Sequence, residues 1–294
     1  MSMLLTKRLA RSLWRTKLRL SAVVFMVAVG VFAGISFGTY ANAATSLYDG
    51  IYDGEDGINL ADIWVENPSG VWNESASENI CSSIENDWPD SNYKLESCEP
   101  RLILDGMMFT SDSSGDEKPI PAVWHGIDEG LVDKVWMPTY SELSSGRIAE
   151  NSDEIVLDSH VAKALEIEVE DTIEISSGYG KSTYKVVGIG FHSMHLYFAT
   201  EGSSIPAEAG TFATGYMTDE GLEALANLSA GSSNMILIDL EGSPVYDLQS
   251  TTEWNENPEL TKLVNDISAL MYVVDDSPVS VYDRSGVFSV ELLR

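Results

Sequence analysis

The chain has 294 residues, of which 44% are hydrophobic and 21% are charged. That apolar content is sufficient for packed cores and argues against a disordered acidic chain. With 17 basic and 46 acidic residues the formal net charge is −29. Such an acidic balance argues against nucleic acid as a partner, because phosphate binding requires a cationic surface.

Positive charge is concentrated at the N-terminus. Residues 1–19 hold six basic residues and no acidic one, whereas the remainder holds 11 basic and all 46 acidic residues, about −35 in net charge. Leu5, Leu9 and Leu13 lie at i, i+4 spacing, and Trp14 follows them. This pattern predicts a basic amphipathic arm on the cytoplasmic membrane surface. An arm that only directs membrane insertion is the alternative.

A long apolar segment follows the arm. Residues 20–44 are 25 consecutive residues without a charge, and about 20 helical residues suffice to cross a hydrocarbon core of ~30 Å. We therefore predict a transmembrane helix over 20–44, with the basic arm in the cytoplasm and the acidic body outside. Gly30, Gly34 and Gly38 lie on one face of that helix and predict a helix-packing surface. A cleaved signal peptide, with its small-residue site at 41–43, is the alternative.

The body, from residue 45 on, contains two cysteines, Cys81 and Cys98. In an oxidising compartment they could form a disulfide that contributes about 3 kcal/mol by loop closure. Two free thiols are the alternative, because sequence alone does not place the two Cα atoms.

Short strands and helices alternate along the first and last thirds of the body. Alternating apolar positions predict strands, and apolar residues three and four apart predict helices. In the first third we expect strands over 59–67, 93–108 (one or two strands around Pro100) and 120–126, a helix over 75–86, and a hairpin loop over 111–119. In the last third we expect strands over 214–217 and 234–240, and helices over 219–228 and 257–271.

The middle of the body is richer in strands. We expect strands over 154–157, 171–176 and 182–190, with a short helix over 159–165, and then a Gly/Ala/Ser/Pro-rich connection over 201–210. The predicted fold class is therefore α+β: one N-terminal transmembrane helix and a two-lobed extracytoplasmic domain. A mixed α/β lobe formed by residues 45–140 and 211–290 carries an inserted β-rich lobe formed by residues 141–210.

Several short patterns suggest chemistry but lack its context. Residues 180–183 imitate the end of a P-loop, yet the required first glycine is missing and the segment joins two strands. His192 and His195 have no carboxylate close in sequence, and Ser193 lacks a nucleophile elbow. The acidic segments 48–56 and 275–276 do not match a calcium loop. We predict no catalytic, cofactor or metal site, and expect that the chain is not an enzyme; the Asn-x-Ser sequons at Asn73 and Asn227 suit a surface location.

The order of these features resembles FtsX-like ABC transporter permeases, in which a membrane helix is followed by a MacB-type periplasmic core domain. The resemblance rests on a basic arm before a Gly-containing membrane helix and on a stretch in the middle of the body. The residues that carry it are Arg11–Arg19, Ser145-Gly146-Arg147, Asp153–Leu157, Ala162, Leu165, Asp171-Thr172-Ile173 and Tyr184–Ile189.

The resemblance implies two lobes, further membrane helices after the body, a dimer or paired permease half, and a cytoplasmic ABC ATPase partner. ATP hydrolysis on that partner would move the membrane helices and, through them, an outer domain that acts on lipoprotein, lipid, peptide or cell-envelope partners. The chain stops where a second membrane helix is expected, so it is interpreted as a truncated permease. The alternative function is a membrane-anchored or secreted binding module without an ATPase partner.

Overall fold

The computed structural model describes residues 17–52, 59–111, 117–127, 132–135, 137, 144–178, 180–191, 208, 210–242, 257–274 and 279–283. The chain divides into two compact units, Met1–Asp56 and Gly57–Arg294. The basic arm through residue 16 and the last residues, 284–294, lie outside the described residues.

The first unit contains one long helix, α2, over Lys17–Tyr52. It covers the whole uncharged run predicted to be helical. Its described side chains are those of residue 17, residues 21–36, and residues 38 and 39, and its large apolar groups lie exposed, with Phe25 at 70% and Phe32 at 72%. Within the part of the chain that the structure describes, no helix combines the length and apolarity needed to cross a membrane.

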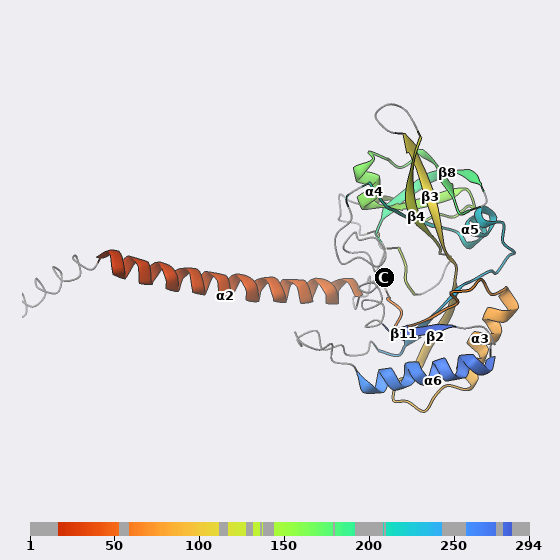
Figure 1. Ribbon diagram of the computed structural model, residues 1–294, viewed down its shortest axis with the longest axis horizontal. Helices are drawn as coiled ribbons and strands as arrows, with labels where there is room; N and C mark the ends of the chain where they lie inside the picture. Colours follow the sequence, from red (N-terminus) through yellow and green to blue (C-terminus); the bar gives the residue numbers. More distant parts are fainter. Residues whose placement is uncertain are drawn as a thin grey trace, which may run out of the picture. The chain divides into compact units, whose positions relative to one another are not determined.

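The second unit begins and ends in a four-stranded antiparallel sheet with the order β11-β1-β10-β2. Its strands are β1 (Ile63–Glu66), β2 (Leu95–Arg101), β10 (Met235–Leu240) and β11 (Ser280–Asp283). Helices α3 (Glu74–Asn86) and α6 (Pro258–Val274) lie beside each other along this sheet (Figure 1). Their apolar faces form one core with the inward residues of β1 and β10.

The start of α3 is fixed by its capping residue. The Asn73 side chain accepts a hydrogen bond from the Ala76 N–H at 2.9 Å, which satisfies one of the free donors of the first turn. From there the helix turns Ile80, Cys81 and Ile84 toward the sheet, as the i, i+4 spacing predicts.

The remaining strands form a seven-stranded sheet with the order β5-β8-β6-β9-β4-β3-β7. They are β3 (Ile103–Ser111), β4 (Glu117–Gly126), β5 (Ser145–Gly146), β6 (Glu154–Asp158), β7 (Thr172–Ser176), β8 (Lys181–Gly190) and β9 (Ala213–Met217). Since β7 pairs with both β3 and β8, strands β8, β6, β9, β4, β3 and β7 form a closed ring. Helices α4 (Ser159–Ala164) and α5 (Asp219–Ala226) follow β6 and β9.

The largest fully buried side chain in the core of this small barrel is that of Trp124. Its indole Nε1 donates to the Ser176 carbonyl of β7 at 2.9 Å. Gly106 of β3 provides the necessary room, because a Cβ there would lie 2.1 Å from the Ser176 oxygen and 2.2 Å from the indole nitrogen. The glycine thus lets the indole pack directly against the β3–β7 pairing that helps to close the barrel.

The inserted portion of the body is longer than the expected 141–210. Strands β3 and β4 before it and β9 after it pair within the barrel sheet, so the segment between β2 and β10 begins at Ile103 and includes α5. The cause is the β3–β4 hairpin, whose ladder runs from Ile103↔His125 to Ser111↔Glu117 and holds both strands away from the four-stranded sheet. The predicted loop over 111–119 is correspondingly shorter, and its residues 112–116 lie outside the described part.

Candidate functional site

The three glycines predicted to form a helix-packing face lie in the middle of α2. A Cβ placed on Gly30, Gly34 or Gly38 would meet no atom of the described chain within 4 Å. The face they form is therefore open to a close-packed neighbour, and this chain provides none among its described residues.

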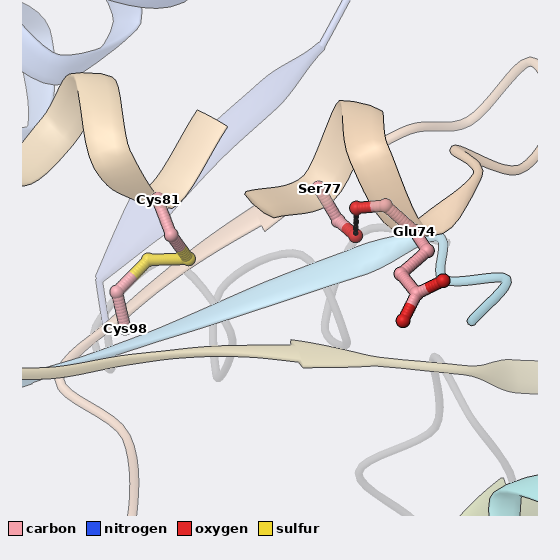
Figure 2. The surroundings of a disulfide bond; sticks show 4 residues. All are labelled: Glu74, Ser77, Cys81 and Cys98. Carbon is pink, nitrogen blue, oxygen red and sulfur yellow. Dashed lines mark hydrogen bonds between the residues drawn. A yellow bond between two sulfur atoms is a disulfide. The ribbon is translucent and has the colours of Figure 1, made fainter. Parts of the chain in front are cut away.

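Cys81 and Cys98 are joined by a disulfide, with their Cα atoms 5.7 Å apart (Figure 2). Cys81 comes from the buried face of α3, and Cys98 from β2, which is one of the two edge strands of the four-stranded sheet. Figure 2 also shows the first turn of α3, where the Ser77 hydroxyl donates to the Glu74 carbonyl at 3.0 Å. The disulfide thus fastens the middle of the helix to the sheet.

The remaining sequence patterns offer no assembled chemistry. The P-loop-like segment lies at the turn from β7 into β8, where the Lys181 amine pairs with Glu117 and lies 3.7 Å from the centre of the Phe109 ring. No group of three or more His, Cys, Asp or Glu side chains within the described ranges could hold a metal ion. His192, Ser193, His195, Asp275 and Asp276 lie outside the described residues.

A cluster of polar contacts lies at the junction where the chain passes between the two sheets. It crosses once from β2 to β3 and once from α5 to β10. The Asn234 side chain fastens the two crossings together: its Oδ1 accepts from the Ile103 N–H at 2.9 Å and its Nδ2 donates to the Ile103 carbonyl at 2.8 Å. The Asn234 N–H also donates to the Arg101 carbonyl at 3.0 Å.

Arg101 places a buried cation at this junction, and its side chain is only 6% exposed. Its two terminal nitrogens donate to the Gly126 carbonyl at 3.3 Å and to the Val132 carbonyl at 2.8 Å. The Glu99 carboxylate lies 3.4 Å from the same guanidinium and accepts from the Val132 N–H at 3.3 Å. Since a buried charge must be paired and hydrogen-bonded, these bonds hold the end of β2 against the end of β4.

Three buried carboxylates line the entry into β1. Asp62 accepts from the Leu240 N–H at 3.0 Å and Asp133 accepts from the Ala61 N–H at 3.1 Å. Asp239 accepts from the Asn59 side-chain amide at 2.6 Å. Each carboxylate accepts a hydrogen bond from a main-chain N–H or a side-chain amide and so fixes the position of the chain around it.

A second ion pair lies at the barrel. The buried Glu154 of β6 accepts a bidentate pair from Arg147 together with the Glu150 and Asn151 N–H groups. The Arg147 guanidinium and these N–H donors hold the pKa of Glu154 well below its usual range, although burial opposes them. In return, the hydrogen bond to Glu154 raises the pKa of Arg147. The pair fixes the segment that leads from β5 into β6.

Two buried tyrosines stay neutral and serve packing. Burial raises the pKa of Tyr216, which lies against His125 with ring centres 5.1 Å apart. Burial also raises the pKa of Tyr184, whose hydroxyl donates to the Gly221 carbonyl at 2.8 Å. Neither phenol is placed for acid–base chemistry at neutral pH.

The first and last strands of the body are neighbours. β1 pairs with β11 in antiparallel register from Ile63↔Asp283 to Glu66↔Ser280. The residue at which the chain enters this sheet and the residue at which it leaves therefore lie opposite each other, roughly 5 Å apart between Cα atoms. The first residue of β1 and the last residue of β11 therefore lie at the same end of one strand pair.

The sequence predictions concerned the cysteine and glycine positions and did not include the junction. Arg101 carried a usable signal, because it is an isolated cation followed directly by the apolar run Leu102-Ile103-Leu104 in a chain with few basic residues. Asn234 carried none, since its role depends on a partner 131 positions away.

Among the solved structures that are similar to this chain are two domains of ABC-type transporters. The periplasmic region of MacB from Actinobacillus actinomycetemcomitans is 10% identical with a TM-score of 0.42, and the match covers 79% of this chain and 92% of that one. The extracellular domain of the ABC-type transporter YknZ from Gram-positive bacteria is 9% identical with a TM-score of 0.40, and the match covers 76% of this chain and 99% of that one. Both TM-scores lie below 0.5, so neither likeness assigns a family. No family model matches the chain, and no curated protein matches it.

Proposed function

We propose that the body is the extracytoplasmic domain of an FtsX-like ABC transporter permease, anchored by a membrane helix over residues 20–44. In this role a cytoplasmic ABC ATPase hydrolyses ATP, the membrane helices move, and the body transmits that motion to a lipoprotein, lipid, peptide or cell-envelope partner. The body contributes no chemical step of its own.

The observation that carries this proposal is the pairing of β1 with β11. A domain inserted between two membrane segments must receive and return the chain at neighbouring points, and Ile63 and Asp283 are such points. A domain that hangs from a single anchor has no such requirement. The residues quoted above for the family resemblance support the same reading.

The junction between the two sheets gives the body a path for motion. Displacement of the four-stranded sheet, which receives the chain, reaches the barrel through the Arg101 guanidinium and the Asn234 amide. Both links use directional hydrogen bonds, which are buried at Arg101 and partly buried at Asn234, so they couple the two sheets through fixed donor and acceptor positions.

The anchor is supported by the sequence of residues 20–44. The run has no charge, follows six basic residues and precedes the first acidic residue, Asp49. The open face of Gly30, Gly34 and Gly38 suits close packing against a second permease chain, as a homodimer or a paired half, within membrane lipid. The arm then lies in the cytoplasm, where the ATPase is.

Labelling of new cysteines in intact cells tests the topology. Tyr272, which is 68% exposed in the body, and Lys7 of the arm are each replaced by Cys; the native pair is bridged and does not react. A membrane-impermeant maleimide should label Tyr272→Cys in intact cells and Lys7→Cys only after lysis. Labelling of Lys7→Cys in intact cells would exclude the proposed orientation.

The alternative function is an anchored or secreted binding module that works without an ATPase. Recovery of a P-loop ATPase with the detergent-solubilised full chain, and loss of that ATPase when residues 1–19 are deleted, would support the permease. Release of a soluble chain that starts near Ala44, with no ATPase bound, would support the module.

A further inference from the structure

We propose that Asn73 and Asn227 are acceptors for N-linked oligosaccharide, and that their glycans cover one seam of the body. The inference rests on the proposed function in one respect, namely that the body lies outside the cytoplasm. The acceptor pattern is Asn-x-Ser/Thr with any residue but proline between, and it requires an exposed amide.

The Asn73 site is open. Asn73 lies exposed at the N-cap of α3 in extended backbone, and Ser75, the hydroxyl residue of the pattern, is exposed in the first turn. The capping bond uses the Asn73 Oδ1, and no hydrogen bond among the described residues uses its Nδ2. A glycan on Nδ2 is therefore compatible with the helix cap.

The Asn227 site is open in the same way. Asn227 ends α5 in the left-handed region, at φ 53° and ψ 43°, where its main-chain N–H bonds back to the helix. Its side chain and that of Ser229 are exposed. The main chain thus holds this turn while the side-chain amide faces solvent.

A third Asn-x-Ser sequence is excluded as an acceptor for two reasons. Asn67-Pro68-Ser69 carries the proline that blocks transfer. Asn67 is also only 8% exposed, and its Oδ1 accepts from the Ser69 N–H at 3.1 Å. The two asparagines in permitted acceptor sequences, Asn73 and Asn227, are thus exposed, whereas Asn67, in the sequence that proline blocks, is buried.

The two open sites border one seam. The segment that follows Asn227 runs along the start of α3: Trp72 and Ser233 exchange main-chain hydrogen bonds at 2.7 and 3.0 Å. A Cβ on Gly231 would lie 2.4 Å from the Glu74 Cβ. Figure 1 places α3 and α5 along the same side of the body. Glycans on both residues would shield this side and leave other surfaces for protein partners.

The chemistry requires a co-reactant of the class of polyprenyl-phosphate-linked oligosaccharides. The asparagine Nδ2 forms a bond to C1 of the first sugar, while the bond from C1 to the phosphate oxygen breaks. The phosphate leaves with the electron pair, and the amide nitrogen loses one proton.

The test uses the full chain purified from its source membranes, cleaved after acidic residues and analysed by mass spectrometry. Peptides with Asn73 and Asn227 should each carry one oligosaccharide mass, and the peptide with Asn67 none. Ser75→Ala should remove the oligosaccharide mass on Asn73 only, and Ser229→Ala the mass on Asn227 only. Ser75→Thr should retain the mass on Asn73. Because Ser75 is exposed, Ser75→Ala should keep the wild-type urea midpoint. The Ser229 hydroxyl lies 3.3 Å from that of Ser232, so the urea midpoint of Ser229→Ala is measured beside its glycan mass.

Unmodified Asn73 and Asn227 would overturn the inference, and so would modification that persists in Ser75→Ala and Ser229→Ala. Cysteine labelling of the same cells separates this failure from failure of the proposed function. If Tyr272→Cys is labelled from outside and both asparagines are unmodified, glycosylation alone is refuted. Tyr272→Cys protected from the reagent refutes the outside location and glycosylation with it.

Discussion

Removing the disulfide between Cys81 and Cys98 should weaken the four-stranded sheet and its helices by an amount that the structure sets. The two residues are 17 apart in sequence, and the loop-closure relation for that separation gives about 3 kcal/mol. The double variant Cys81→Ala/Cys98→Ala removes the bridge without leaving a thiol. We expect the free energy of unfolding of this part of the body to fall by about that amount.

The assay is urea unfolding followed by tryptophan fluorescence, because Trp72 and Trp88 belong to the core that contains Cys81. With a urea m-value of about 1–3 kcal/mol per M, the midpoint should fall by roughly 1–3 M. Reductant should lower the wild-type midpoint to that of the variant and leave the variant unchanged. An equal midpoint for the two proteins under oxidising conditions would refute the loop-closure reasoning.

Four further predictions concern the barrel, its ion pair, the anchor and the charge. Gly106→Ala should destabilise the body by about 2 kcal/mol or more because its Cβ meets atoms at 2.1 Å, whereas Gly70→Ala, which meets nothing within 4 Å, should change the urea midpoint little. Glu154→Gln should destabilise the body most at neutral pH. Because the pKa of Glu154 is lowered in the folded state, the stability that its carboxylate supplies is present above about pH 4.3 and is lost on acidification. The difference in unfolding free energy between wild type and variant should therefore disappear in an acid titration. Val27→Asp adds a charge that costs about 3 kcal/mol at the centre of a membrane helix, so a smaller fraction of the protein should stay in the membrane pellet after alkaline extraction. The control Val71→Asp, in the body, should leave the same fraction in the pellet as wild type. The excess acid should make the thermal midpoint of the body rise with KCl concentration, and a midpoint independent of salt would contradict this expectation.

Local signals in the sequence located most helices and strands of the body. The helix predicted over 75–86 begins one residue earlier, because Asn73 caps it. The strand around Pro100 resolves into β2 and β3, with Pro100 inside β2 and the break at Leu102. Proline is tolerated there because β2 is an edge strand. These features depend on neighbours within a few residues, which is why sequence reveals them.

The extent of the inserted lobe and the junction could not be predicted in the same way. Whether β3, β4 and β9 join the small sheet or the barrel depends on pairings such as Ala122↔Ala213, between residues far apart in the chain. Periodicity gives the face that a strand buries but not its partner. The same holds for Arg101, whose carbonyl partners include Val132, 31 positions away.

The antiparallel pairing of β1 with β11 also decides how the body responds to load. Forces that pull Ile63 and Asp283 apart sideways act on one ladder bond at a time, starting with the outermost, so the pair unzips under weak tension. Forces that push or pull both residues together leave that ladder unloaded and pass along the strands into the sheet. The strand pair is therefore stiff toward motion that Ile63 and Asp283 share and compliant toward motion that separates them.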